Sequence, residues 1–189
     1  HRDLHSFPTR RSSDLYLNRL NIYLLNAGPD RNLEALADSI QAMTAVNICH
    51  PNFLVSPLQS VQGSIPISDL NERIDYESQA AVSRLDLAVV HSTVTGTGVR
   101  VAVIDGGVNY MHPILSGAVQ SGYDYVDDDA DAFDEPGGVN SGHGTFVAGL
   151  IHLIAPNAQI VAYRVTDTAG ESHGYLVAES ILRAIDDGC

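Results

Sequence analysis

The chain contains 189 residues with a formal net charge of −13 at pH 7, and all ten of its basic residues are arginines. This acidic balance argues against nucleic acid or another polyanion as a partner. No run of about 18 apolar residues occurs, so we expect no membrane-spanning helix and no membrane partner. The two cysteines, Cys49 and Cys189, match no zinc-binding spacing, and we expect both to be unpaired in this chain.

The first fifteen residues differ in character from the rest. Residues 4–15 resemble a translated sequencing adapter, so we set residues 1–15 aside as an adapter-derived artefact. The chain has no initiator methionine, and we expect a fragment that is open at both ends. The remaining residues suit one modest domain and a smaller one. We expect an α+β segment over 16–55, a linker over 56–75 and a truncated α/β domain over 76–189.

The first predicted elements form a strand–helix–strand pattern. Residues 21–25 are strand-like, and Asp30 or Asn32 is placed to cap the helix that follows. Apolar residues then recur at helical spacing from Leu33 to Met43. Residues 46–55 are predicted to form a second strand, interrupted by Pro51.

Helices and strands alternate from residue 76 onwards, which predicts a parallel sheet with helices on both faces. The predicted helices span 79–91, 143–154 and 175–187. The predicted strands span 100–104, 122–126 and 159–165, and the first and last are apolar runs of the kind that is buried on both faces. Between them, residues 127–141 form an acidic loop.

Two short segments carry the residues of chemical interest. Residues 101–107 place Asp105 at the carboxyl end of a strand, followed by two glycines that allow a sharp turn. Residues 142–149 place His143 between two glycines at the start of a helix. Because functional groups gather where parallel strands end, we expect Asp105 and His143 to lie within about 4 Å of each other. A carboxylate that holds an imidazole in one tautomer is part of the arrangement that activates a serine hydroxyl.

Each of these residues alone allows other interpretations. Asp105 is compatible with a helix cap, a phosphate acceptor or a metal ligand, and His143 with a structural role. A dinucleotide site requires glycines after the strand, whereas Gly96 and Gly98 precede it. A two-aspartate phosphatase needs an aspartate where Gly107 stands, and no His-Glu-x-x-His zinc motif occurs.

The joint pattern resembles the subtilisin-like serine peptidases, the subtilases, in which the aspartate also precedes the histidine. The resemblance covers residues 76–189 densely, through the runs at 76–79, 96–99, 101–107, 142–149, 155–158 and 163–170. It implies an incomplete subtilisin-like α/β fold in which Asp105 and His143 are catalytic. The serine block of that family is not in this chain. We therefore expect the nucleophile, the oxyanion-hole asparagine and most of the specificity pocket to lie beyond Cys189.

The same resemblance assigns two further segments. By position, Gly170, Glu171, Ser172 and His173 correspond to the extended edge where substrate backbone adds as a strand, although a plain surface loop is an equally good interpretation. Residues 46–55 resemble the last strand of subtilase propeptides. This implies an intramolecular propeptide over 16–55 with a cleavage point in the linker, and an unrelated small domain is the alternative.

No metal site is assigned from the sequence. The family's His-Pro-Asp-Leu run, whose aspartate helps to bind calcium, has Ile114 at that position, and the loop that completes the site is shortened between His152 and Ala155. Calcium needs several oxygen ligands, so we expect none there. The acidic loop leaves a different calcium site open, but we interpret it as a solvated, mobile run of charge. It contains Asp127, Asp128, Asp129, Asp131, Asp134 and Glu135.

We therefore predict that the parent protein is a secreted serine endopeptidase that cleaves polypeptides. Asp105 would orient His143, which would act first as general base and then as general acid. Gly106 replaces the serine or threonine that usually follows the catalytic aspartate, so one supporting hydroxyl is missing. The chain itself lacks the nucleophile, and we expect it to be inactive. The alternative is a non-catalytic binding protein or pseudoenzyme on the same scaffold.

Overall fold

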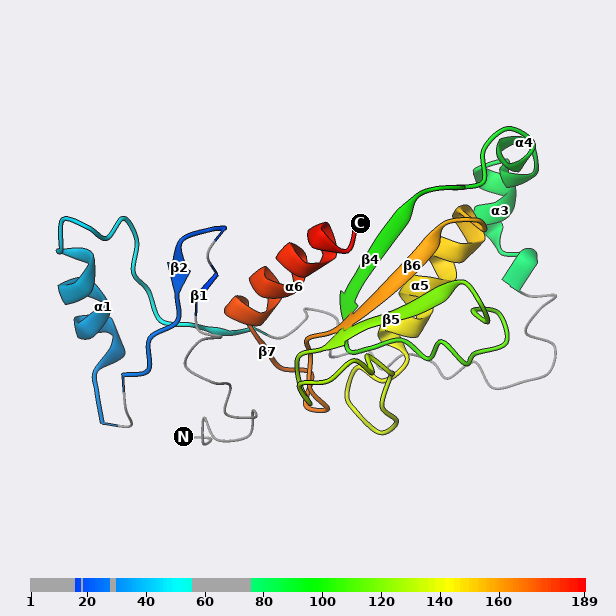
Figure 1. The fold of residues 1–189 in the computed structure, drawn as a ribbon. Helices are drawn as coiled ribbons and strands as arrows, with labels where there is room; N and C mark the ends of the chain where they lie inside the picture. The colour runs from blue at the N-terminus through cyan, green and yellow to red at the C-terminus, as the bar shows by residue number, and fades with distance from the viewer. Residues whose placement is uncertain (1–15, 18, 28–29, 56–75) are drawn as a thin grey trace.

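The computed structural model describes residues 16–17, 19–27, 30–55 and 76–189. The adapter-like residues 1–15 and the expected linker 56–75 lie outside the described residues. At the centre of the fold is a three-stranded parallel sheet in the order β4–β6–β5 (Figure 1). These strands are β4 (Arg100–Asp105), β5 (Val119–Asp124) and β6 (Gln159–Arg164). The α/β class with a parallel sheet, predicted from the sequence, is confirmed.

Side chains alternate along β6 and divide the core into two layers. Ile160 and Ala162 pack with helix α5 (His143–Ile154), where Ala148 is fully buried. Val161 and Tyr163 pack on the opposite face with helix α6 (Gly174–Asp186), through Ala184. The helices thus cover both faces of the sheet, and β6 is its central, most buried strand.

β4 is less buried than predicted. Only Val103 of this strand falls in the buried class, and its other residues are half-buried. Among the described residues β4 pairs with β6 on one side only, so its other edge has no neighbouring strand. Its side chains still pack on both faces, Val103 in the layer of α5 and Ala102 and Ile104 against the layer of α6, but their burial is less complete than expected.

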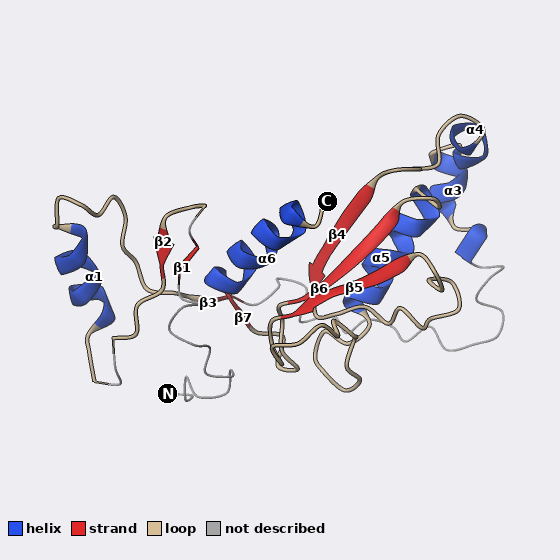
Figure 2. Ribbon diagram, viewed as in Figure 1, coloured by secondary structure: helices blue, strands red, loops and turns tan. Residues whose placement is uncertain are grey.

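The register brings the carboxyl ends of all three strands to one edge. Asp105 on β4 and Asp124 on β5 both pair with Arg164, the last residue of β6. Figure 2 shows that the loops after β4 and β5 begin at this edge. Because parallel strands deliver their last side chains together, three charged residues distant in sequence become neighbours.

Two predicted elements of residues 76–189 differ in the structure. The helix predicted over 79–91 is divided into α3 (Ala80–Arg84) and α4 (Leu87–His91), because Asp86 between them has a left-handed backbone with φ of 50°. The strand predicted over 122–126 begins earlier and forms β5, and Tyr125 and Val126 already belong to the following turn.

The N-terminal part contains short elements with little core. Strands β1 (Tyr16–Leu17) and β2 (Ile22–Tyr23) pair antiparallel, and helix α1 (Leu33–Gln41) begins after Asn32, whose Oδ1 accepts a hydrogen bond from Ala35 N at 3.1 Å. Of the strand predicted over 46–55, only β3 (Leu54–Val55) forms. Within the described part of residues 16–55, the buried apolar residues are Leu17 and Ala37.

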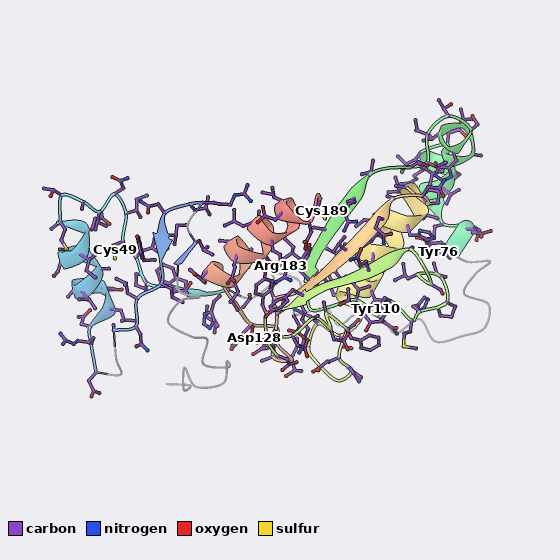
Figure 3. The ribbon with its side chains drawn as sticks, viewed as in Figure 1. Cys49, Tyr76, Tyr110, Asp128, Arg183 and Cys189 are labelled. Carbon is purple, nitrogen blue, oxygen red and sulfur yellow. The ribbon has the colours of Figure 1, made fainter. Side chains whose placement is uncertain are left out.

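Cys49 and Cys189 are free thiols, and Figure 3 shows them on separate parts of the molecule. Across the described ranges, no helix combines the length and the apolar character that crossing a bilayer would require.

Candidate active site

Asp105 is the last residue of β4 and is held by one backbone and one side-chain hydrogen bond. Its carbonyl oxygen accepts a hydrogen bond from Val165 N at 2.8 Å, which ties it to the neighbouring strand. Its side-chain Oδ1 accepts a second bond from Gly106 N at 2.7 Å. These two bonds fix both the position of the residue and the orientation of its carboxylate.

His143 meets this carboxylate from the start of α5. The preceding residue, Gly142, has φ of 87°, a left-handed conformation that favours glycine. Nδ1 of His143 lies 2.7 Å from Oδ2 of Asp105, which confirms the contact expected from the sequence. A carboxylate only accepts hydrogen bonds, so Nδ1 carries the proton and Nε2 of the neutral ring is the proton acceptor. The two side chains are 27% and 17% exposed, so the pair is shielded yet reachable.

Two glycines allow the helix start to approach the loop after β4. A Cβ atom on Gly144 would lie 2.2 Å from the carbonyl oxygen of Gly107 and 3.1 Å from Cβ of Asp105. A Cβ atom on Gly107, which has φ of 99°, would lie 2.4 Å from the carbonyl oxygen of Phe133. Both contacted oxygens belong to the backbone, so they cannot move aside as the end of a flexible side chain could. Positions 107 and 144 therefore require glycine. The approach of His143 to Asp105 depends on this absence of side chains.

Asp134 is a buried carboxylate beside the pair. It is 8% exposed, although the sequence placed it in a solvated loop. Its Oδ2 accepts hydrogen bonds from Gly142 N at 2.9 Å and from Thr145 Oγ1 at 2.6 Å. Burial raises the pKa of Asp134, and the charge of Asp105 acts in the same direction, whereas the bonds from Thr145 and Gly142 act against this rise.

Arg164 organises the other end of the acidic loop. Its guanidinium is 3% exposed and contacts Asp124 Oδ2 at 2.7 Å, Asp127 Oδ2 at 2.6 Å and Glu135 Oε2 at 3.2 Å. A buried guanidinium requires such partners because removing its charge from water is costly. Arg164 therefore holds carboxylates that are distant from it in the sequence.

Two more acidic side chains of the loop accept hydrogen bonds from tyrosine hydroxyls. Tyr110 donates to Asp131 and Tyr123 donates to Asp128, both at 2.5 Å. Tyr110 and Asp128 are labelled in Figure 3. The expectation of a solvated run of charge is therefore wrong for Asp134, which is buried, whereas the other acidic residues of the loop are exposed and several of them have protein partners.

The predicted substrate edge begins in a tight turn. Asp167 Oδ1 accepts hydrogen bonds from Ala169 N and Glu171 N, both at 2.9 Å, and Gly170 has φ of 77°. The next residues form strand β7 (Ser172–His173), which pairs antiparallel with β3. Ser172 is buried at 4% exposure. Of the four residues proposed from the sequence, Ser172 and His173 thus lie in a strand, and Gly170 and Glu171 lead into it.

Sequence reasoning missed two residues that contact the site region. In the sequence Asp134 is one of six acidic residues of a loop, and Thr145 is one residue of the run 142–149. No sequence spacing predicts that Asp134 contacts a helix that starts nine residues later, so only the folded loop identifies it. The polar Thr145 in the first turn of an apolar helix is the one available signal, since such hydroxyls usually have a local partner.

The described residues do not fit a calcium ion. The acidic side chains of the loop point to different protein donors, which are Arg164, two tyrosine hydroxyls and the amide and hydroxyl groups around His143. No group of three or more His, Cys, Asp or Glu side chains converges on a common centre in the part of the chain that the structure describes. Calcium requires several oxygen ligands around one point, and the described acidic side chains do not provide them.

Comparison with known proteins identifies relatives of this site. The family model described as the subtilase family matches residues 96–189, which contain Asp105, His143 and the edge at 170–173. The chain is 32% identical over 167 residues to the thermophilic serine proteinase of Bacillus sp. (strain AK1), a match that covers 83% of this chain and 38% of that protein. It is 36% identical over 103 residues to thermitase of Thermoactinomyces vulgaris, covering 49% of this chain and 35% of that protein.

A solved structure agrees with these matches. The crystal structure of a lanthipeptide protease aligns with a TM-score of 0.53 and 30% sequence identity, over 64% of this chain and 35% of that chain. The present chain therefore spans little more than a third of the length of each of these relatives. The match to the Bacillus proteinase includes more residues than 96–189 contains, so it also reaches the segment upstream.

Proposed function

We propose, on the premise that this chain belongs to the subtilase family of serine peptidases, that Asp105 and His143 are the aspartate and histidine of a serine endopeptidase. The observation that carries the proposal is the 2.7 Å contact between His143 Nδ1 and Asp105 Oδ2. It supplies an oriented base, which is what a serine hydroxyl needs to become a nucleophile. The serine itself is proposed to belong to a longer parent protein.

The proposed chemistry assigns one task to each residue. Nε2 of His143 takes the proton of the serine hydroxyl as its oxygen bonds to the carbonyl carbon of the scissile peptide. The resulting imidazolium is stabilised by Asp105 and then gives this proton to the leaving amine nitrogen as the C–N bond breaks. A water molecule then attacks the acyl carbon while His143 takes one of its protons. The ester bond breaks as His143 returns this proton to the serine oxygen, which releases the carboxyl product and the free serine. Asp105 stays ionised throughout and holds the ring.

The edge at 170–173 is proposed to bind substrate backbone. The pairing of β7 with β3 supports this assignment, because it demonstrates that an extended segment fits antiparallel against Ser172 and His173. Main-chain hydrogen bonds of this kind give affinity without depending strongly on the side chains of the partner. Gly170, Glu171, Ser172 and His173 would thus position a polypeptide for attack.

Residues 16–55 are proposed to be an intramolecular propeptide. Two contacts besides the strand pairing support this: Asn52 Oδ1 accepts a hydrogen bond from Tyr175 N at 3.2 Å, and Phe53 O accepts one from Gly174 N at 3.5 Å. Both donors lie at the start of α6, which has no side-chain cap of its own. A propeptide seated here would cover the substrate edge until the linker at 56–75 is cut, so we further propose a zymogen.

The remaining assignments rest on the family premise. We propose that the parent is secreted and acts outside the cell, that residues 76–189 are part of its catalytic domain, and that residues 1–15 are foreign. We propose that no calcium ion binds around Ile114 and that any calcium ion of the parent occupies a different site. The strongly acidic composition is consistent with a polypeptide substrate rather than nucleic acid.

A fluorophosphonate that labels activated serines tests the proposal. The parent protein should be labelled at one serine, and His143→Ala should abolish labelling because the hydroxyl then has no base. The chain of residues 1–189 should not be labelled. If a correctly folded parent shows no labelling and no cleavage of unfolded protein substrates, the chain derives from a non-catalytic binding protein or pseudoenzyme instead.

A further inference from the structure

The carboxylate of Asp134 connects three segments that surround the Asp105–His143 pair. It belongs to the loop before α5, and it binds Gly142 N, the amide directly before His143, at 2.9 and 3.1 Å. It also accepts a bond from the Thr145 hydroxyl, in the first turn of α5, at 2.6 Å. The same Thr145 oxygen accepts a bond from Asn109 N at 2.9 Å. Asn109 lies in the loop that follows Asp105 and its two glycines.

We propose that Asp134 is a positioning residue of the proposed catalytic pair, which holds the turn of His143 against the loop that follows Asp105. The catalytic role of this contact rests on the proposed function. The hydrogen bonds of Asp134 themselves do not depend on that function. The hydrogen bonds of its carboxylate go to Gly142 N and the Thr145 hydroxyl, so Asp134 acts on His143 through the residues on either side of it.

The local structure explains why such a residue is needed. Gly142 has a left-handed backbone, and α5 has no side-chain cap from its own N-cap residue. The first amides of a helix lack partners inside the helix and carry a partial positive charge. An ionised Asp134 satisfies the Gly142 amide and complements this charge. Without it, the Gly142 amide would lose its acceptor, and the Thr145 hydroxyl would keep only its bond from Asn109 N.

Burial strengthens the hydrogen bonds of Asp134 to Gly142 and Thr145. Asp134 is 8% exposed, so its bonds compete little with water. A Cβ on Gly107 would meet the carbonyl of Phe133, the residue before Asp134, at 2.4 Å. The loop that carries Asp134 is thus packed directly against the loop after Asp105. Movement of one segment is transmitted to the other, and so to the distance between Asp105 and His143.

The test is an NMR experiment on the chain of residues 1–189. The proton on Nδ1 of His143 should give a separate low-field resonance, because it lies in a short hydrogen bond to a carboxylate. In Asp134→Asn this resonance should be lost or should exchange with water at least about tenfold faster, the factor expected when a hydrogen bond to a charged group is removed. Thr145→Val should act in the same direction, whereas Thr145→Ser keeps the hydroxyl and should restore the signal.

Asp131→Asn is the matched control. It removes the same charge from the same loop at an exposed position, and its amide oxygen still accepts from Tyr110. It should leave the low-field proton unchanged. If Asp134→Asn lowers the urea midpoint but leaves the resonance and its exchange rate as in Asp131→Asn, Asp134 is only structural and the inference is wrong. Should Asp134→Asn not fold, Thr145→Val and Thr145→Ser decide the question by the same measurement.

The outcome also separates this inference from the proposed function. If the unmodified chain lacks a low-field proton that depends on Asp105, the pairing of Asp105 with His143 fails, and the proposed function fails with it. If that proton is present and responds to Asp105→Ala but not to Asp134→Asn, only the role of Asp134 is rejected.

Discussion

Gly144 and Gly107 lie so close together that a single added carbon would force them apart. A Cβ atom on Gly144 would lie 2.2 Å from the carbonyl oxygen of Gly107. Gly144 follows His143, and Gly107 lies two residues after Asp105. The distance between the two proposed catalytic side chains is therefore set by backbone packing between their neighbours.

Substitution of Gly144 by alanine should separate the pair. We expect Gly144→Ala to lower the free energy of unfolding by about 1–3 kcal/mol, the usual cost of inserting a carbon into a packed site. Gly149→Ala lies in the same helix, and its Cβ would come no closer than 3.9 Å to Tyr76. This control should be neutral or slightly stabilising, since alanine favours helix. Urea denaturation measures both, and equal effects would contradict the packing argument.

Removal of the Arg164 side chain should be strongly destabilising. Arg164→Gln leaves Asp124, 1% exposed, without its cation, and breaking a buried pair in this way costs about 3–5 kcal/mol. The double variant Arg164→Gln/Asp124→Asn should recover part of this loss, because the uncompensated buried charge is gone. Denaturant unfolding of both variants provides the comparison. A double variant less stable than Arg164→Gln alone would show that the Asp124 charge is not the cause.

A half-buried histidine should make the fold sensitive to mild acid. His152 Nδ1 has no hydrogen-bond partner within the described residues, and burial lowers the pKa of this side chain below its ordinary value of 6.5. The unfolded chain takes up a proton near pH 6.5 whereas the folded chain does so only at lower pH. Stability is therefore lost as the pH falls from about 6.5 to the lowered pKa.

The variant His152→Leu tests this dependence. It should flatten the fall in unfolding free energy between pH 7 and the acid limit, by at most about 1.4 kcal/mol per pH unit for one proton. The measurement is the urea midpoint at a series of pH values. An unchanged pH dependence in His152→Leu would assign the acid sensitivity to other groups.

Asn52 should protect the start of α6. Its side chain is the acceptor for Tyr175 N, so Asn52→Ala should raise the hydrogen-exchange rate of that amide by about tenfold. Asn47→Ala, an exposed position in the same N-terminal part, is the control and should have no effect there. Equal exchange at Tyr175 in both variants would mean that the proposed propeptide does not hold this helix in solution.

The sequence predicts those features that depend on local patterns. Apolar runs predict β4 and β6, and the glycines around Asp105 and His143 indicate both turns, because each signal lies within a few residues. The kink at Asp86 and the burial of Asp134 were not predictable in this way. Asp86 adopts its left-handed backbone without a glycine, and Asp134 is buried by donors on α5. The pairing of Val55 with Ser172 likewise depends on tertiary contact rather than on strand propensity.

The central claim is that Asp105 serves His143 in peptide-bond cleavage, and the kinetics of Asp105→Asn in the parent protein test it most directly. Asparagine keeps the shape of the side chain, but its amide favours the wrong tautomer of the ring. We predict that kcat for a peptide substrate falls by about 10⁴-fold at neutral pH, with little change in KM and an unchanged urea midpoint. A folded Asp105→Asn enzyme whose kcat stays within about tenfold of the unmodified protein would contradict the account.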